Sequence, residues 1–354
     1  MSDPDPHPTE TLCAAGSSHL EAVELLEPRD VPLGGLRAMN VRRTLPQRAR
    51  SLIGAWCFLD HYGPDDVAAT GGMNVPAHPH TGLQTVSWLF SGEIEHRDSA
   101  GYHAFVRPGE LNLMTAGAGI SHSERSTPGT RVLHGAQLWV ALPEATRNGP
   151  KGFEHYAPPV ITGEQWTGQV FLGSLLGDTS PVETHTPLVG AELRLDPGST
   201  VMVDVAGAFE HGILVDSGTV SVAAVSEGAS EHACPVAPHE LAYLAPGAHA
   251  IRIAAGDEGA RILLIGGTPF DEEIIMWWNL VGRSHEEVAQ ARAAWQAEIA
   301  AAGVGDPSTD GVGASPENGA PGSGRFGLPD DEPDPPLPAP KLPVARLVPR
   351  RQPK

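Results

Sequence analysis

The chain has 354 residues, enough for two domains with a sizeable hydrophobic core. Its 41 glycines and 34 prolines favour a turn-rich β protein over a helical bundle. The 43 acidic and 23 basic residues give a net charge of −20. Such a surface repels nucleic-acid phosphates and anionic membranes, so we expect neither as a direct partner.

The beginning of the chain shows no targeting signal. It is acidic and proline-rich, without the basic region and apolar core of a signal peptide. No apolar run reaches 18 residues, so no membrane span is expected. Three cysteines (Cys13, Cys57 and Cys234) cannot form a disulfide framework. We therefore expect a cytoplasmic protein in a reducing compartment.

Shifts in composition divide the chain into four parts. We expect a loose N-terminal extension over 1–28, a first domain over 29–150, a second domain with closing helices over 151–302, and a tail over 303–354. The tail holds 12 of the 34 prolines, which excludes a continuous helix or a central strand there. The tail is expected to be extended, and either strapped onto the surface or disordered.

Short β-like runs bounded by Gly and Pro fill the two central parts. In chain order, the predicted strands are Thr85–Phe90, Leu138–Leu142, Val201–Val205, His211–Val215, Thr219–Val222 and Arg261–Ile265. A turn is expected at 216–218, from which the next strand returns. Residues 110–117 resemble 240–247, and this weak repeat favours two similar β units in tandem.

One helix is predicted after the second β region. Ser284 and Glu287 form a capping box, and Gly303 is a natural stop. The residues between them carry one apolar stripe: Val288, Ala291, Trp295 and Ile299. A shorter helical segment over 272–279 is expected to lead into this helix.

Two pairs of potential metal ligands stand out in the first β region. His78 and His80 are two residues apart, and so are His122 and Glu124. In a strand, this spacing places both side chains on one face. Three imidazoles and one carboxylate suit Fe, Ni, Cu or Zn. The alternative is two unrelated histidine pairs on the surface or in the core.

The segments around these residues resemble the pirin family. Pro76–Ser87, Met114–Glu124 and Gln137–Pro143 occur in the pirin order and spacing. In the tail, Arg325–Gly327 and Pro338–Pro340 are similar to elements of bacterial members. The resemblance covers about residues 35–300 and is strongest over 74–143.

The resemblance implies an all-β bicupin, with two tandem cupin β-barrels in one chain. It implies that the N-terminal barrel binds one metal through His78, His80, His122 and Glu124. We expect one divalent transition metal per chain, with Fe(II) as the first choice and Ni, Cu, Zn or Mn as alternatives. Gln84 stands where many members carry a glutamate, and a neutral amide cannot act as a base there.

The second barrel is expected to hold no metal. The positions that match the ligands by offset from the repeat are Ala206, Arg252 and Ala254. In the first barrel, we expect His96, Asp98 and His103 to lie in a solvated loop, with the mouth of the pocket as the alternative. Trp88 and Trp139 are expected to belong to the core.

The resemblance implies an iron-dependent dioxygenase of the quercetin 2,3-dioxygenase type, an oxidoreductase. A flavonol-like substrate would bind at the metal with dioxygen, and Glu124 would be the catalytic residue that accepts the substrate's enol proton. The alternative is a non-catalytic, metal- and redox-dependent regulatory binding protein of the transcriptional co-regulator type, with a protein partner. A third possibility is an isomerase of a small polar metabolite, because cupins host several chemistries.

Overall fold

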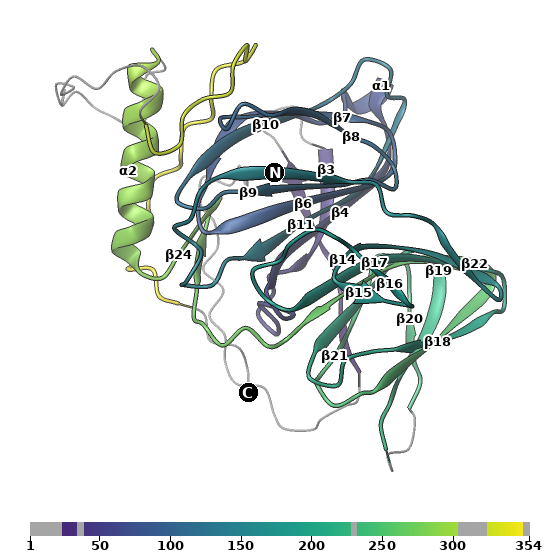
Figure 1. Cartoon of the computed structure of the whole chain (residues 1–354). Helices are drawn as coiled ribbons and strands as arrows, with labels where there is room; N and C mark the ends of the chain where they lie inside the picture. Colours follow the sequence, from purple (N-terminus) through teal and green to yellow (C-terminus); the bar gives the residue numbers. More distant parts are fainter. Residues whose placement is uncertain (1–22, 34–38, 228–231, 304–323, 350–354) are drawn as a thin grey trace.

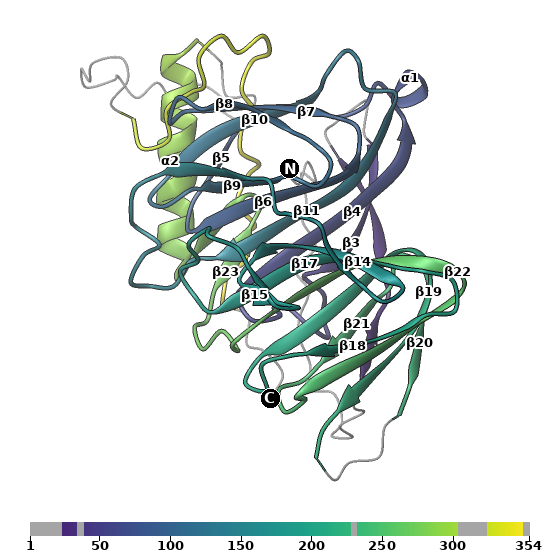
Figure 2. The same cartoon turned by 45° about the vertical axis from the view of Figure 1, so that its right-hand side comes forward.

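Two β-barrels and one long helix make up the fold (Figure 1). The computed structural model describes residues 23–33, 39–227, 232–303 and 324–349. The helix lies against the outer side of the first barrel in both views (Figure 2). The expected all-β class with two tandem barrels is therefore confirmed.

The first barrel consists of two antiparallel sheets. A seven-stranded sheet has the order β12-β9-β6-β11-β4-β3-β2. Its strands are β2 (Arg29–Leu33), β3 (Met39–Leu45), β4 (Trp56–Asp66), β6 (Leu83–Ser91), β9 (Leu111–Thr115), β11 (Val132–Ala141) and β12 (Gly152–Tyr156). A four-stranded sheet has the order β5-β10-β7-β8. Its strands are β5 (Asn74–His80), β7 (Ile94–Asp98), β8 (His103–Val106) and β10 (Ile120–Ser126). The one-turn helix α1 (Val67–Thr70) follows β4.

The second barrel is built on a nine-stranded antiparallel sheet. Its central path has the order β1-β21-β19-β22-β17-β14-β13, and β18 and β20 pair with β22 and β19. Its strands are β1 (Glu24–Leu26), β13 (Ile161–Gly163), β14 (Trp166–Leu172), β17 (Leu188–Leu195), β18 (Thr200–Asp204), β19 (Glu210–Val225), β20 (Cys234–Val236), β21 (Leu241–Leu244) and β22 (Ala250–Gly267). A small hairpin joins β15 (Ser174–Leu175) to β16 (Asp178–Thr179). Residues 24–26, expected in the loose extension, thus form a strand of this barrel, and residues 1–22 lie outside the described part.

All six predicted strands overlap observed ones, but the predicted turn at 216–218 is wrong. The chain continues through these residues as the single long strand β19. Two bulges, between Val215 and Ser217 and between Gly218 and Val220, flank the Ser-Gly pair, and Ser217 and Gly218 themselves stay paired with Arg261 and Ala260 of β22. A Ser-Gly signal fits a bulge as well as a hairpin turn, because both accept a glycine with positive φ.

The capped helix is observed as α2 (His285–Ala301). The Ser284 hydroxyl accepts a hydrogen bond from the Glu287 amide at 3.2 Å, and the predicted apolar stripe is buried.

The prediction of a shorter helix over 272–279 is wrong. There the chain forms a hairpin of β23 (Ile275–Trp277) and β24 (Leu280–Gly282), with Trp278 at φ 53° in its turn. Ile275 and Trp277, two residues apart, are buried on one face of β23, which is the alternation of a strand and not the spacing of a helix.

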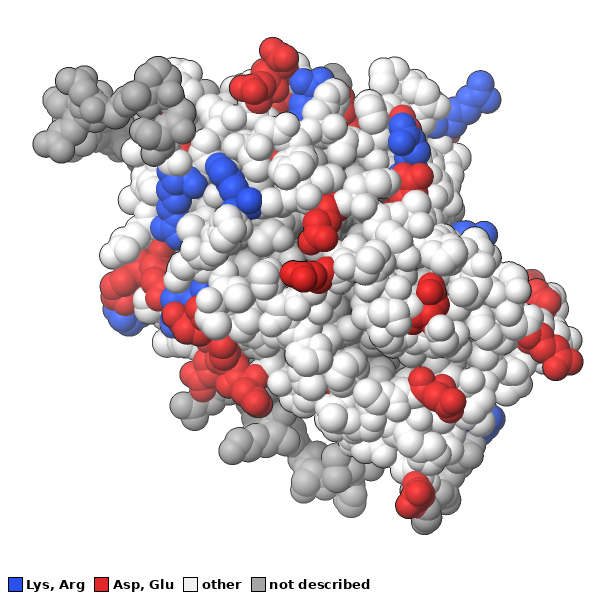
Figure 3. All heavy atoms as spheres, in the orientation of Figure 1, with Lys and Arg blue, Asp and Glu red and all other residues white. Residues whose placement is uncertain are grey.

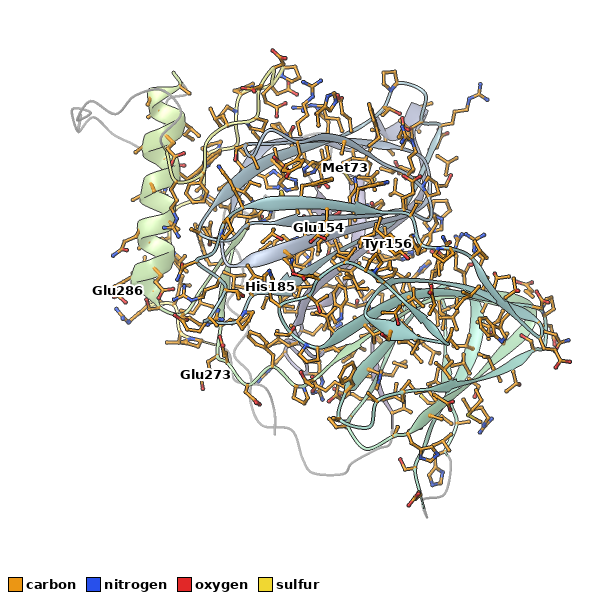
Figure 4. All side chains as sticks on the ribbon, viewed as in Figure 1. Met73, Glu154, Tyr156, His185, Glu273 and Glu286 are labelled. Carbon is orange, nitrogen blue, oxygen red and sulfur yellow. The ribbon has the colours of Figure 1, made fainter. Side chains whose placement is uncertain are left out.

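The two barrels share a hydrophobic core. The rings of Trp88 and Phe171, one from each barrel, stack at 4.6 Å. The Trp88 indole donates to Glu192 of β17 at 2.7 Å, and the Trp56 indole donates to the Gly266 carbonyl at 3.1 Å. Figure 4 shows side chains filling both barrels, with Tyr156 of β12 near their junction. Because apolar and polar contacts cross the junction, the barrels stabilise one another.

The described part of the tail, residues 324–349, packs on the first barrel and α2 without helix or strand. Phe326 is fully buried against Trp295 of α2, at 5.7 Å between ring centroids. The Glu298 carboxylate accepts the Phe326 and Gly327 amides at 3.2 and 2.9 Å. Further along, the Leu337 amide donates to the Ala77 carbonyl of β5 at 2.8 Å. The tail therefore ties α2 to the strands of the four-stranded sheet.

The face of the molecule drawn in Figure 3 agrees with the net negative charge of the sequence. Figure 3 shows acidic side chains scattered over this face and no large basic patch. None of the described helices is long and apolar enough to cross a membrane.

Phe326→Ala tests the contribution of the tail. Removing a fully buried ring leaves a cavity between the tail and α2, so the free energy of unfolding should fall by about 3–5 kcal/mol. Chemical denaturation of the full chain measures this loss. Val344→Ala, a truncation at an exposed position of the same tail, should change stability by less than about 0.5 kcal/mol. Equal effects of the two variants would contradict this account.

Candidate metal centre

Strands β5 and β10 bring three of the predicted ligands together. β10 pairs antiparallel with β5, with His122 opposite His78 and Ile120 opposite His80. Each of the three imidazoles is completely buried. One nitrogen of each lies within 4.8 Å of the other two, and such a group could hold a metal ion.

Hydrogen bonds set the tautomers of His78 and His80. His78 Nδ1 lies 2.9 Å from the Pro76 carbonyl, and His80 Nδ1 lies 3.0 Å from the Asn279 carbonyl. A carbonyl only accepts, so each Nδ1 carries the proton and each Nε2 presents a lone pair. His80 Nε2 lies 3.1 Å from His122 Nε2. His78 Nε2 is buried and has no hydrogen-bond partner among the described residues.

Burial keeps the three imidazoles neutral. It lowers the pKa of His78, His80 and His122 well below the usual value, because the charged form would lose its hydration. The mutual proximity of the rings lowers the pKa values of His80 and His122 further. Neutral imidazoles with converging lone pairs are what a transition metal requires, so the residues present fit such an ion.

The fourth predicted ligand, Glu124, lies on the same face of β10 and is completely buried. Its carboxylate forms a separate potential ligand group with His122 and His96, within 4.8 Å. The Ser87 hydroxyl lies 3.3 Å from Glu124 Oε1 and 2.9 Å from Gln137 Oε1. Ser87 and Gln137, on β6 and β11, thus give this carboxylate a polar wall inside an otherwise apolar barrel.

The prediction of a solvated loop is wrong for two neighbours of the site, His96 and Asp98. His96 and Asp98 do not lie in a solvated loop: both are buried on β7, whereas His103 is exposed on β8. β7 pairs with β10 so that Asp98 is opposite His122 and His96 is opposite Glu124. The signal available in the sequence was a third alternating pair, His-x-Asp, four residues after Gly92.

A second group of potential ligands lies where the barrels meet. His61 of β4 and His134 of β11 both approach the Asp216 carboxylate of β19. His61 Nε2 lies 2.7 Å and His134 Nε2 lies 2.6 Å from Asp216 Oδ1. All three side chains are buried, and nothing in the sequence spacing predicts their proximity.

The tautomers at this junction oppose metal binding. Arg42 Nη1 lies 3.1 Å from His61 Nδ1, and Arg261 Nη2 lies 3.4 Å from His134 Nδ1. A guanidinium only donates, so each Nδ1 carries the lone pair and each Nε2 carries a proton that faces Asp216. Arg261 also donates to Asp216 Oδ2 at 2.7 Å. With both Nε2 atoms protonated and two guanidinium groups adjacent, this cluster serves as an ion-pair and hydrogen-bond network.

The remaining predicted positions belong to neither group of potential ligands. Gln84 is buried and donates to the Thr115 hydroxyl at 2.9 Å. Trp88 and Trp139 both lie in the core, as predicted. Trp139 stacks on Phe58 at 4.0 Å and meets the His80 ring edge-on at 5.2 Å. Within the described residues of the second barrel, no three potential ligands form a group of their own.

Two tandem β-barrels with convergent imidazoles in the first define a bicupin with a candidate metal centre. The chain belongs to the pirin family: residues 37–140 match the family model Pirin, and residues 190–299 match the Pirin C-terminal cupin domain.

Relatives over most of the chain agree with this assignment. A Pseudomonas aeruginosa protein, named as a candidate quercetin 2,3-dioxygenase, is 42% identical over 81% of this chain and 90% of its own. A pirin-like protein of Caulobacter vibrioides is 35% identical over 73% of this chain and 88% of its own. The crystal structure of a quercetin 2,3-dioxygenase from Acinetobacter baumannii matches with a TM-score of 0.78 and 35% identity, over 92% of this chain and 97% of that one.

A bacterial pirin from Escherichia coli, crystallised in complex with nickel(II), shares the fold. Its TM-score is 0.55 and its identity 20%, over 70% of this chain and all of its own.

Metal analysis can distinguish the two histidine groups. The full-length protein should contain one transition-metal ion per chain, and His80→Ala should lose most of it because one of few neutral ligands disappears. His61→Gln should keep the metal, since the tautomer of His61 prevents coordination. Elemental analysis of both variants decides this. Loss of metal from His61→Gln with retention in His80→Ala would reverse the assignment.

The junction network makes stability depend on pH. Burial lowers the pKa of His61, so the unfolded chain binds a proton that the folded chain excludes. The pKa of His61 in the unfolded chain is about 6.5. The contribution of neutral His61 to the free energy of unfolding is therefore complete above that pH and is lost as the pH falls below it. The hydrogen bonds from His134 and His61 lower the pKa of Asp216, so its contribution is lost only at far lower pH.

His61→Gln isolates this effect. Between pH 7 and pH 5, the variant's free energy of unfolding should fall less steeply than the wild type's, by up to about 1.4 kcal/mol per pH unit for one proton. His249→Gln, which replaces an exposed histidine, should keep the wild-type slope. Unfolding titrations at several pH values provide the measurement, and an unchanged slope in His61→Gln would be evidence against a buried neutral imidazole.

Proposed function

We propose that the protein is a metal-dependent dioxygenase of the quercetin 2,3-dioxygenase type, with His78, His80, His122 and Glu124 as ligands. The observation that carries the proposal is the convergence of three buried, neutral imidazoles, two of them with Nε2 lone pairs set by backbone carbonyls. The names of relatives at 42% and 35% identity support the substrate class, a flavonol.

The chain's own groups would supply binding and proton transfer. A bound Fe(II) would provide Lewis-acid and redox chemistry toward an enol substrate and dioxygen. Glu124 is a buried carboxylate within 4.8 Å of a His122 nitrogen and can accept the enol proton of a flavonol. The Ser87 hydroxyl beside Glu124 Oε1 can stabilise the carboxylate and fix its orientation. Trp139, edge-on to His80, contributes an apolar wall that excludes water.

We propose Fe(II) as the resident ion and the cytoplasm as the location. The mixed nitrogen and oxygen donor set supports iron and equally accepts Ni, Cu, Zn or Mn. Nickel(II) in the Escherichia coli pirin belongs to that protein and makes nickel the first alternative. The free thiols of Cys57 and Cys234 agree with a reducing compartment.

We keep the domain limits of 29–150 and 151–302 as a proposal. The two family models fall inside them, at 37–140 and 190–299. The tail limit at 303 agrees with the end of α2 at Ala301.

Glu124→Gln tests the function. The amide keeps the shape of the side chain but cannot accept the proton, so part of the metal should remain while quercetin-dependent oxygen uptake falls by roughly 10²-fold or more. Glu154→Gln, an exposed carboxylate on β12 (Figure 4), should leave both readings unchanged. Metal content and oxygen uptake are measured on the same preparations.

Two outcomes contradict the proposal in different ways. Wild-type turnover that Glu124→Gln leaves intact removes the catalytic role of Glu124. Iron-loaded wild type without any oxygen uptake rejects the dioxygenase and favours the metal-dependent regulatory binding protein, in which the ion state would set the affinity for a protein partner.

A further inference from the structure

Hydrogen bonds link the outer edge of His122 to His96 and then to Asp98. His122 Nδ1 lies 3.4 Å from His96 Nδ1, and His96 Nε2 lies 3.1 Å from Asp98 Oδ2. His96 and Asp98 are 3% and 2% exposed, so solvent does not compete for these contacts. The opposite edge of His122, at Nε2, faces His80.

Asp98, at the far end of this hydrogen-bonded series, determines which nitrogen of each histidine carries the proton. Asp98 Oδ1 accepts the backbone amides of Ala100 and Tyr102 at 2.8 and 3.2 Å, which fixes the carboxylate in the β7–β8 turn. A carboxylate only accepts, so His96 Nε2 carries the proton that faces Asp98 Oδ2. On an imidazole with this one proton, Nδ1 is an acceptor, and it faces His122 Nδ1. His122 Nδ1 must supply the proton, which leaves the lone pair of His122 on Nε2.

We propose that His96 and Asp98 are positioning residues that hold His122 in the tautomer able to bind a metal through Nε2. The inference rests on the proposed metal site and adds two residues to it that lie outside its four ligands. His96 faces the edge of His122 that points away from His80, so it acts through His122 and does not join the three imidazoles at the ion. Outer partners of this kind orient a ligand and raise its basicity.

The geometry at Asp98 allows a nearly isosteric variant that reverses the direction of the hydrogen bonds between Asp98, His96 and His122. In Asp98→Asn, the side-chain oxygen stays with the amides of Ala100 and Tyr102, and the NH2 group faces His96 Nε2. His96 then carries its proton on Nδ1 and donates to His122 Nδ1. His122 is left with a proton on Nε2, which must be removed before a metal can bind.

Cobalt(II) binding to the metal-free full-length protein tests the inference. The dissociation constant is measured by competition with a chelating dye, and the visible absorption of bound Co(II) reports its ligand geometry. Asp98→Asn and His96→Phe should raise the dissociation constant by about 10- to 100-fold, the usual cost of losing an outer partner. They should also shift the Co(II) spectrum.

Two further variants separate positioning from folding. His96→Gln keeps an oxygen that can accept from His122 Nδ1, so its affinity should recover part of the loss seen in His96→Phe. His103→Gln, on the neighbouring strand β8, is exposed and should bind Co(II) like the wild type. Melting temperatures of the metal-free variants show whether Asp98→Asn is folded.

The outcomes distinguish the inference from the proposal beneath it. Unchanged affinity and spectrum in folded Asp98→Asn, with binding abolished in His80→Ala, overturns the positioning role and leaves the metal site intact. An equal loss in His96→Gln and His96→Phe also overturns it, because the acceptor would then be irrelevant. Wild type without Co(II) binding, or binding that survives in His80→Ala, rejects the metal site and the inference together.

Discussion

The register of strand β10 is the constraint on which the site depends. β10 lies between β5 and β7, and its pairing sets His122 opposite His78 on one side and opposite Asp98 on the other. A shift of one residue would turn every alternate side chain to the other face of the sheet and separate these groups. A bulge between His122 and Glu124 on the β5 side changes the register there without disturbing the pairing with β7. Three alternating pairs, one on each strand, therefore produce one buried polar cluster.

Two clusters of buried histidine in this molecule have opposite chemistry because their partners differ. At the candidate metal centre, carbonyl oxygens accept from Nδ1 of His78 and His80 and leave the Nε2 lone pairs inside the barrel. At the barrel junction, arginines donate to Nδ1 of His61 and His134, and the Nε2 protons face a carboxylate. Both groups are buried, and in each the potential ligand atoms lie within 4.8 Å of one another. The neighbouring donor or acceptor decides whether an imidazole can serve as a ligand or as a link between domains.

Features that depend only on neighbouring residues in the sequence were predicted correctly. The alternation of His78 with His80 and of His122 with Glu124 predicted which side chains share a face, and the capping box at Ser284 predicted the start of α2. Pairing between distant strands carries no local signal, so the approach of His61 to Asp216, 155 residues later, was not predicted. The His-x-Asp spacing indicates that His96 and Asp98 share a face, but only the pairing of β7 with β10 places them beside the site. The Ser-Gly pair at 217–218 and the apolar run at 274–278 have two structural solutions each, and only the pairing of β19 with β22 and of β23 with β24 selects one.

The second half of the chain contributes to the first barrel's site although it supplies none of the proposed ligands. After the second barrel, the β23–β24 hairpin returns to the first, where Leu280 bridges to Thr81 and the Val281 amide donates to the Thr81 carbonyl at 3.1 Å. This docking places the Asn279 carbonyl against His80 Nδ1 and so sets that imidazole's tautomer. An isolated first barrel would lack this acceptor and the core shared through Trp88 and Phe171. The tandem arrangement is thus a requirement of the site's chemistry as well as of its stability, since His80 is aligned by a residue almost 200 positions away.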